Sequence, residues 1–226
     1  MLKNEISDIL STSKPIGWVL EPHAKRIFSL AGMDTSRFIW TTEVEEAVKY
    51  ARDLGYPVVA KVVSPKILHK SDKDGVVVGV RTDEALRETF RRFSQMEGFV
   101  GILVDEMVSG IELIVGAKID DQFGPVILLG IGGIGVEIYK DVTIRMAPLG
   151  SNVADSMMKC LMAHQLLEGY RGSKPVDAAK LNQLLVNFSI LAADLQEHVE
   201  SIDLNPVMCS PTRCVVADAR IMLKKE

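Results

Sequence analysis

Apolar runs rich in β-branched residues alternate with amphipathic segments over the first half of the chain. They predict three strands, at residues 57–63, 75–80 and 101–107. Helical spacing of apolar positions lies between these runs, over residues 43–54, which end before Gly55, and in a segment that opens at Asp83. These elements predict a first lobe of mixed α and β structure.

From Ile111 onward the pattern changes to longer stretches with strand-like alternation. The predicted strands are residues 111–119, 125–133, 136–149, 201–208 and 214–223. Helices are expected near residues 155–167 and 177–198. This arrangement predicts a second lobe with a mostly antiparallel sheet, so the expected division is 1–103 and 104–226. A cleft between two lobes is a favoured place for a ligand.

Composition supports a globular chain of this size. The 226 residues are 47% hydrophobic and 25% charged, enough for one large domain or two closely packed lobes. The net charge is −4 and the basic residues are scattered among acids, which argues against a nucleic-acid partner.

Three cysteines form no CxxC pair, and no stretch of about 18 apolar residues suggests a membrane span. The N-terminus lacks the apolar run of a signal peptide. We therefore expect reduced thiols in a cytoplasmic protein that does not associate with a membrane.

Lys61 interrupts an apolar strand, and a lysine in such a place needs a partner. It either reaches water from an edge strand or holds its ammonium group beside nucleotide phosphates. The polar loop that follows carries His69 among lysines. A histidine among cations tends to stay neutral, which leaves a ring nitrogen able to attack phosphorus. The alternative is an ordinary solvated loop histidine.

Residues 130–135 match GxGxxG after a predicted strand, but the context does not suit a dinucleotide-binding unit. That fingerprint requires a helix to open at the glycines, whereas residues 136–146 alternate like a strand. The glycines are better explained by a close backbone approach to phosphates in a turn, or by a tight hairpin.

Two C-terminal segments carry oxygen ligands that suit magnesium. Asp203 and Asn205 precede Pro206, and Asp218 lies one predicted hairpin later. Neighbouring strands can bring Asn205 and Asp218 side by side, as hard ligands for an ion that also contacts phosphates. The alternative is an Asx turn followed by an exposed strand aspartate.

In their order along the chain, these motifs resemble the ATP-grasp domain of NDP-forming acyl-CoA synthetases, most closely the β subunits of the ADP-forming acetyl-CoA synthetases. The resemblance covers nearly the whole chain. It rests on GYPVVAK, VVSPKILHKSD, GILVDEMVSGIELIVG, FGPVILLGIGGIGVE, KDVTIRMAPL, LLEGYRG, DLNPV and VVADARI. It implies a fold of the α/β (α+β) class, with the nucleotide bound between two lobes.

The resemblance also implies roles for individual residues. His69 would relay phosphate, and Asp203 would join it in catalysis. The residues implied to bind the nucleotide are Lys61, Asp105, Glu106, Met107, Val108, Glu112, Gly132, Gly133 and Arg145. Within that set the backbone of Glu106 and Val108 would read the base, with Glu112 near the ribose. Asn205 and Asp218 would bind Mg²⁺.

The activity implied is that of an acid–CoA ligase (ADP-forming), which reversibly converts acyl-CoA, phosphate and ADP into an acid, CoA and ATP. Positioning and charge neutralisation dominate such phosphoryl transfer. The CoA site and the first phosphohistidine of the family belong to an α subunit, so the resemblance implies an α2β2 heterotetramer.

One departure from the family pattern affects the expected phosphate relay. The family usually has a hydrophobic residue and two glycines after HKSD, whereas this chain has Lys73, Asp74 and Gly75. This departure keeps open the alternative that the chain is a nucleotide-sensing regulatory subunit without relay. A further alternative, independent of the departure, is an ATP-grasp carboxylate–amine ligase that needs no histidine nucleophile.

Overall fold

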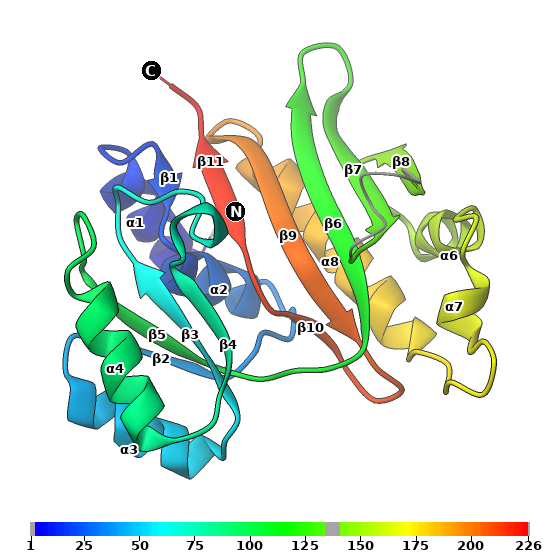
Figure 1. Ribbon diagram of the computed structural model, residues 1–226. Coiled ribbons are helices and arrows are strands. Elements are labelled where there is room, and N and C mark those ends of the chain that lie inside the picture. The colour runs from blue at the N-terminus through cyan, green and yellow to red at the C-terminus, as the bar shows by residue number, and fades with distance from the viewer. Residues whose placement is uncertain (1–2, 134–140, 226) are drawn as a thin grey trace. The chain divides into compact units, whose positions relative to one another are not determined.

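The computed structural model of the chain describes residues 3–133 and 141–225 (Figure 1). The chain divides into two compact units, of which one is discontinuous in sequence. The first unit joins Met1–Thr35 to Ser109–Glu226, and the second is Ser36–Val108. These units do not follow the expected division between residues 103 and 104, because the first 35 residues pack with the C-terminal part of the chain. We describe each unit by itself.

The second unit is built on a four-stranded antiparallel sheet, counted over its described residues. Its strands, in spatial order, are β2 (Phe38–Thr41), β5 (Gly101–Glu106), β3 (Val58–Val63) and β4 (Val76–Val80). Helices α3 (Val44–Leu54) and α4 (Asp83–Phe93) pack together on one face of it (Figure 1). A short 3₁₀ turn, Ser71–Lys73, lies between β3 and β4.

The sequence explains both helices of this unit. Helix α3 ends at Leu54 and is followed by Gly55, whose φ of +93° favours glycine. Helix α4 begins after Thr82, whose hydroxyl accepts a hydrogen bond from the Ala85 amide at 3.2 Å. The core lies between the helices and the sheet, and it includes Ala47, Val48, Ala51, Val58, Ala60, Val62, Leu86, Phe93, Ile102 and Val104.

The first unit contains a larger antiparallel sheet. Its strands are β1 (Trp18–Val19), β6 (Ile111–Asp120), β7 (Gly124–Ile131), β8 (Val142–Met146), β9 (Val199–Cys209), β10 (Cys214–Val216) and β11 (Arg220–Leu223). Their spatial order is β1-β11-β9-β6-β7-β8, with β10 paired to β9 beside that path. Its helices are α1 (Asn4–Ser13), α2 (Glu21–Leu30), α6 (Ser151–Lys159), α7 (Gln165–Glu168) and α8 (Ala178–Leu195).

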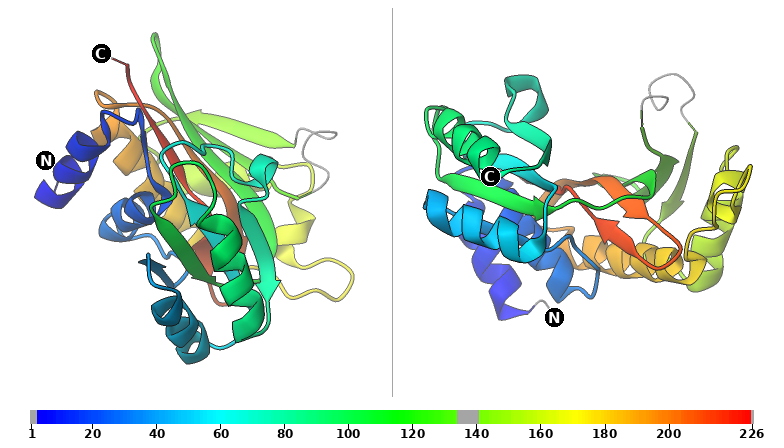
Figure 2. Two further views of the ribbon diagram at one scale, coloured as in Figure 1. Left: turned by 60° about the vertical axis from the view of Figure 1, so that its left-hand side comes forward. Right: turned by 60° about the horizontal axis from the view of Figure 1, so that its bottom comes forward.

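Helix α8 lies along one face of this sheet and contacts β6, β7, β9 and β10 (Figures 1 and 2). Strand burial alternates accordingly. Leu113, Val115 and Ala117 of β6 are buried against the helices, whereas Glu112 and Lys118 are exposed on the opposite face. We call these the helix-covered face and the opposite face. The alternation decides which side chains can form a site on the sheet.

Most elements predicted from the periodicity are confirmed, with three differences. The expected helix at 155–167 is two helices, α6 and α7, and the expected strand at 214–223 is two strands with a bend at Asp218. Part of the expected strand at 136–149 lies outside the described residues, and β8 begins at Val142. The elements that precede residue 42 were not predicted. In the described ranges, no helix has the length and apolar character needed to cross a bilayer.

Candidate functional site

Lys61 has a specific partner within the second unit. Its Nζ lies 3.0 Å from Oδ2 of Asp105, and both side chains are buried. The other oxygen of Asp105 accepts a hydrogen bond from the Ser36 hydroxyl at 2.8 Å. The edge-strand interpretation of Lys61 is wrong, because β3 pairs with β5 on one side and with β4 on the other. Lys61 is therefore a cation held in place by a buried carboxylate.

The register places this ion pair on the face of the sheet that α3 and α4 do not cover. Ala60 and Val62 contribute to the core under the helices, so Lys61 between them points to the other side. Asp105 lies opposite Val59 of β3, on the same face as Lys61. The side chain of Asp105 thus positions the lysine, and the role of Asp105 in binding the nucleotide stays a prediction.

The predicted hinge follows directly at the end of β5. Glu106 forms a bidentate pair with Arg37, whose Nε and Nη2 lie 3.2 and 3.3 Å from the two carboxylate oxygens. The Glu106 amide also donates to the Arg37 carbonyl at 2.8 Å. Met107 is exposed and Val108 is half-buried. The strand end is therefore fixed, while the backbone of the next two residues is outside the sheet.

His69 lies exposed in the loop between β3 and β4, in the same unit as Lys61. The loop is closed against β3 by Gly75, whose amide donates to the Lys70 carbonyl at 2.7 Å and whose carbonyl accepts from the Val62 amide at 2.8 Å. A Cβ on Gly75 would lie 2.6 Å from a Val62 methyl carbon, so the site requires glycine. Asp74 has a φ of +54°, a left-handed conformation that aspartate adopts more readily than most residues.

In the first unit, the hairpin of β9 and β10 brings the two predicted magnesium ligands together. The Ala217 amide donates to the Pro206 carbonyl at 3.0 Å, which continues the ladder that pairs Val216 with Val207. Asn205 and Asp218 come directly after this hydrogen bond, one on each side of the ladder. The expected juxtaposition of these two residues is therefore present in the backbone.

Asp203 lies near Asn205 and Asp218, on the same strand β9 as Asn205. It lies opposite Arg220 of β11, and Nη2 of Arg220 donates to Oδ2 of Asp203 at 3.1 Å. Burial raises the pKa of Asp203 above its usual range, Arg220 opposes this shift, and repulsion from Asp218 adds to it. Two carboxylates and one guanidinium thus interact at one place on the sheet.

The donors of this cluster suit a magnesium ion that phosphates help to hold. Residues 3–133 and 141–225 contain no group of three or more His, Cys, Asp or Glu side chains able to hold a metal by themselves. The carboxylate of Asp218 and the amide oxygen of Asn205 are hard ligands, and Mg²⁺ commonly takes one or two protein ligands together with substrate phosphates. The residues present therefore fit a metal that arrives with a nucleotide.

Glu112 and the glycines after β7 also lie together. The Gly132 amide donates to the Glu112 carbonyl at 2.6 Å, and a Cβ on Gly132 would lie 2.9 Å from that same carbonyl group. A Cβ on Gly133 would lie 3.5 Å from the Glu112 carboxylate. The absence of a side chain at Gly132 allows this approach, whereas the distance at Gly133 is an ordinary contact. Residues 134 and 135, the end of the GxGxxG match, lie outside the described residues.

The register distinguishes Arg145 from the other predicted residues of this unit. Arg145 pairs with Ile127 of β7, which is buried on the helix-covered face. Its guanidinium donates to the Ile144 carbonyl at 2.8 Å and lies 3.8 Å from Sγ of Cys160 at the end of α6. Asp203 pairs with Gly116 on the opposite face. The structure therefore does not bring Arg145 together with Asp203, because the two side chains emerge from different sides of the sheet.

Sequence reasoning missed three residues that hold the predicted ones. Ser36 and Arg37 fix Asp105 and Glu106, and Arg220 pairs with Asp203. Each acts across a strand pairing between distant segments, so local spacing gives no signal. Of the three, Arg220 is the residue that the sequence could most easily have suggested, because it follows Asp218 by two residues in the same motif.

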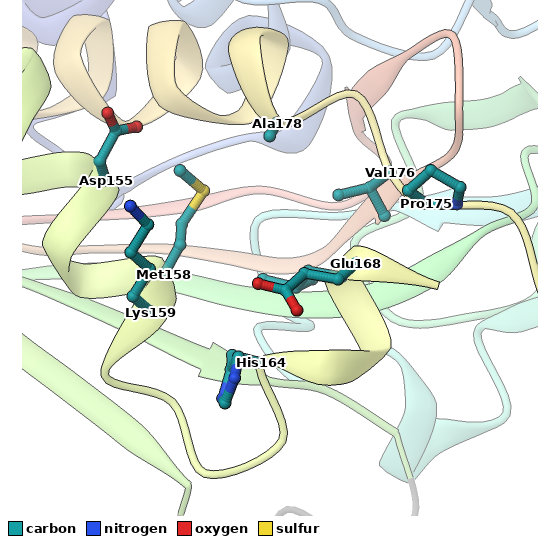
Figure 3. Close-up of a pocket in the computed structure, with 9 residues that line it drawn as sticks. Asp155, Met158, Lys159, His164, Glu168, Pro175, Val176 and Ala178 are labelled. Atoms are coloured by element: carbon teal, nitrogen blue, oxygen red, sulfur yellow. The ribbon is translucent and has the colours of Figure 1, made fainter. Parts of the chain in front are cut away.

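A separate cavity of about 480 Å³ lies among α6, α7 and the start of α8 (Figure 3). Asp155 and Lys159 line it from α6, and His164 and Glu168 line it from the segment of α7 (Figure 3). None of the predicted site residues lines this cavity. It is therefore distinct from the clusters around Lys61 and Asp203.

The chain matches known proteins over nearly its full length. A protein-family model described as an ATP-grasp domain matches residues 12–223. The β subunit of acetate–CoA ligase (ADP-forming) I from Pyrococcus furiosus is 40% identical over 213 residues, which cover 91% of each chain.

Solved structures of an acetyl-coenzyme A synthetase agree with that relationship. The dinucleotide-forming enzyme 1 of Ca. Korarchaeum cryptofilum, in complex with coenzyme A, Ca-AMPCP and HgCl+, gives a TM-score of 0.89 at 38% identity, over 96% of this chain and 99% of that one. A second structure of that enzyme, with coenzyme A and Mg-AMPPCP, has its phosphohistidine segment pointing towards the nucleotide binding site. It gives a TM-score of 0.83 at 37% identity, over 97% and 100% of the chains. The expected ATP-grasp fold is thereby confirmed, and the chain belongs to the ATP-grasp family, in the group that contains the β subunits of the ADP-forming acetate–CoA ligases.

Proposed function

We propose that this chain is the nucleotide-binding β subunit of an ADP-forming acyl-CoA synthetase. In this role it passes a phosphoryl group between a histidine and the terminal phosphate position of ADP or ATP. The observation that carries the proposal is the ladder of β9 and β10, which sets Asn205 beside Asp218 and next to Asp203. Family membership over almost the whole chain supports the same role.

The opposite face of the sheet in the first unit offers a binding surface for the nucleotide, which runs along β6 from Glu112 to Gly116; we call this surface the track. Glu112 and Gly116 lie on the same face of β6, and Gly116 pairs with Asp203. Four residues of strand span about 13 Å, so Glu112 can meet the ribose while Asp203, Asn205 and Asp218 meet the phosphate end. The turn at Gly132 and Gly133 lies beside Glu112 of β6, at one end of this track, where the Gly132 amide donates to the Glu112 carbonyl.

The second unit by itself carries a backbone segment suited to reading the base and a fixed cation. The carbonyl of Glu106 and the amide of Val108 follow a strand end that Arg37 anchors. Lys61 carries its charge on a side chain that Asp105 holds, which suits neutralisation of phosphate with little reorganisation. Magnesium, when bound with the nucleotide, supplies further neutralisation of the phosphate charge.

His69 is the acceptor and donor of the phosphoryl group in this proposal. A neutral imidazole nitrogen attacks phosphorus, a nitrogen–phosphorus bond forms, and the bond to the previous carrier breaks. In the next step an oxygen of ADP attacks the same phosphorus and the histidine leaves with its lone pair. Exposure of His69 in its loop is compatible with access by a carrier from outside the chain.

The carrier belongs to a CoA-binding α subunit, and we propose an α2β2 assembly with it. The match to a chain named as a β subunit supports the existence of a partner. The acyl and CoA chemistry then takes place on the partner, while the nucleotide chemistry takes place on this chain.

Labelling with γ-labelled ATP and magnesium tests the proposal. The chain, with and without its co-expressed α partner, is compared with the variants His69→Ala and His198→Ala. His198 is an exposed histidine remote in sequence from the loop and serves as the matched control. An acid-labile label that disappears only in His69→Ala supports the relay.

Other outcomes favour the alternatives. Nucleotide binding without any label, even with the partner present, would identify a regulatory subunit. Turnover that persists in His69→Ala would favour a carboxylate–amine ligase. Absence of adenine-nucleotide binding in both preparations would refute all three.

A further inference from the structure

Cys209 and Cys214 form a cross-strand pair at the closed end of the β9–β10 hairpin. They are direct partners in the register, and four residues separate them along the chain. Both belong to the buried core of the first unit, with 1% and 3% of their surfaces exposed. Neither residue takes part in the proposed phosphoryl transfer.

The hydrogen bonds on either side identify the type of pair. The Ser210 amide donates to the Arg213 carbonyl at 2.8 Å, and the Ala217 amide donates to the Pro206 carbonyl at 3.0 Å. Hydrogen-bonded and non-hydrogen-bonded pairs alternate along an antiparallel ladder. Cys209 and Cys214, one step inside the Ser210–Arg213 pair, therefore occupy a non-hydrogen-bonded position.

This position gives the separation that a disulfide requires. In non-hydrogen-bonded pairs the Cα atoms are about 4.5 Å apart and the side chains approach most closely. Disulfides span Cα distances of about 4.4 to 6.8 Å. The backbone therefore needs no large movement to accommodate a bond between the two sulfur atoms.

The two thiols are already in contact as free cysteines. A hydrogen bond with Cys214, followed by burial, raises the pKa of Cys209 above its usual range. The Cys214 thiol also lies 3.7 Å from the Asp177 carbonyl, at the start of α8. These contacts keep the sulfur atoms facing each other in the core, where solvent oxidants reach them slowly.

We propose that Cys209 and Cys214 are a site of covalent modification that forms an intrachain disulfide. With a low-molecular-weight disulfide such as oxidised glutathione, the thiolate of one cysteine attacks one sulfur atom of the glutathione disulfide. A mixed disulfide between the protein and glutathione forms, and the first glutathione thiol is released. The second cysteine then attacks the mixed disulfide and releases the other. Two protein thiols lose two electrons and two protons, and one glutathione disulfide becomes two thiols.

The bond would fix the hairpin that carries the candidate magnesium ligands. The same ladder that pairs Cys209 with Cys214 continues to the hydrogen bond between Pro206 and Ala217, next to Asn205 and Asp218. Cross-linking one end of the ladder restrains the other. Any effect on magnesium rests on the proposed function, whereas formation of the bond does not.

The test uses the full chain carrying Cys160→Ser, which removes the exposed thiol and with it cross-linking between molecules. The folded protein is incubated with oxidised glutathione, and free thiols are then counted after denaturation. A peptide map without reductant identifies any linked cysteines. We expect both thiols to disappear, one peptide to join residues 209 and 214, and the melting temperature to rise by about 5 °C.

A matched variant with Cys209→Ser in addition leaves Cys214 without a partner. It should form no cross-link and show no rise in melting temperature on the same treatment. The proposal is overturned if the folded Cys160→Ser chain keeps both thiols after long incubation. It is equally overturned if glutathione stays attached to one cysteine, because the second thiol then fails to reach the first.

Magnesium-dependent nucleotide binding, measured on the oxidised and reduced chains, separates the two proposals. If the cross-link forms but neither the oxidised nor the reduced chain binds nucleotide, the proposed function is refuted while the proposed modification site stands.

Discussion

Lys61 and Asp105 form a buried ion pair with a nitrogen–oxygen distance of 3.0 Å, and Ser36 donates to the second oxygen of the same carboxylate. Removing one partner of such a pair leaves a buried charge without compensation. We expect Asp105→Asn to lower the free energy of unfolding by about 3 to 5 kcal/mol. Urea denaturation of the wild type and the variant measures this change.

The double variant Lys61→Met with Asp105→Leu is the control for that prediction. Replacement of both charges by apolar groups of similar size is often neutral or stabilising, so it should be less harmful than Asp105→Asn alone. A double variant that is less stable than the single one would show that the pair contributes net stability. Whatever its stability, the double variant should lose affinity for nucleotide phosphates, because the Lys61 ammonium group has been removed.

Asp218→Asn should weaken binding of the magnesium–nucleotide complex by about tenfold, or ~1.4 kcal/mol, because the variant removes a charged ligand. Binding of the nucleotide without magnesium should change little. Calorimetric titration in the presence and absence of the ion separates the two effects. Asp121→Asn, at the exposed turn between β6 and β7, is the control. Equal weakening with and without magnesium would argue against a role in binding the ion.

The pKa of Asp203 is raised by burial, so its effect on stability has a definite sign. The folded chain binds the proton more tightly than the unfolded chain, and this contribution is full below the ordinary value of 3.8. It is lost as the pH rises through the raised value. As the pH rises from 3.8 through the raised pKa, the unfolding free energy of the wild type should therefore fall relative to that of Asp203→Asn. Denaturation curves at a series of pH values measure it, and a flat difference would contradict the raised pKa.

Asp74 has a left-handed backbone conformation in the loop that carries His69. A residue with a Cβ and no local hydrogen-bonding group fits this conformation poorly, so Asp74→Ala should cost about 1 kcal/mol of stability. Asp74→Gly should fold at least as well, because glycine adopts this conformation freely. If the relay operates, both variants should keep the His69 label. Loss of label in Asp74→Gly would indicate that the carboxylate itself takes part.

The sequence alone was informative where short-range patterns determine structure. The periodicity predicted α3 and β3 to within one residue at each end and the start of α4 at Asp83, because each buries a regular apolar face. The need for a partner at Lys61 also followed from burial alone. The identity of that partner did not, since it depends on the pairing of β3 with β5 across an intervening strand and helix.

Side-chain direction on the large sheet was equally inaccessible to local patterns. Asn205 and Asp218 belong to one hairpin, so their proximity was predictable. Arg145 was expected among the phosphate ligands, yet the register of β8 against β7 turns it towards α6. A shift of one residue would reverse that direction, and only the long-range pairing determines it.

The pairing of β1 with β11 has a consequence for synthesis on the ribosome. Trp18 and Val19 lie opposite Met222 and Ile221, so β1 cannot pair in the sheet until β11 has been made. Unit Ser36–Val108 is continuous and has its own core, so it can fold while the rest of the chain is still emerging. The large sheet can be completed only after β11 has emerged, so a chain that stalls before β11 keeps that sheet open and exposed to degradation.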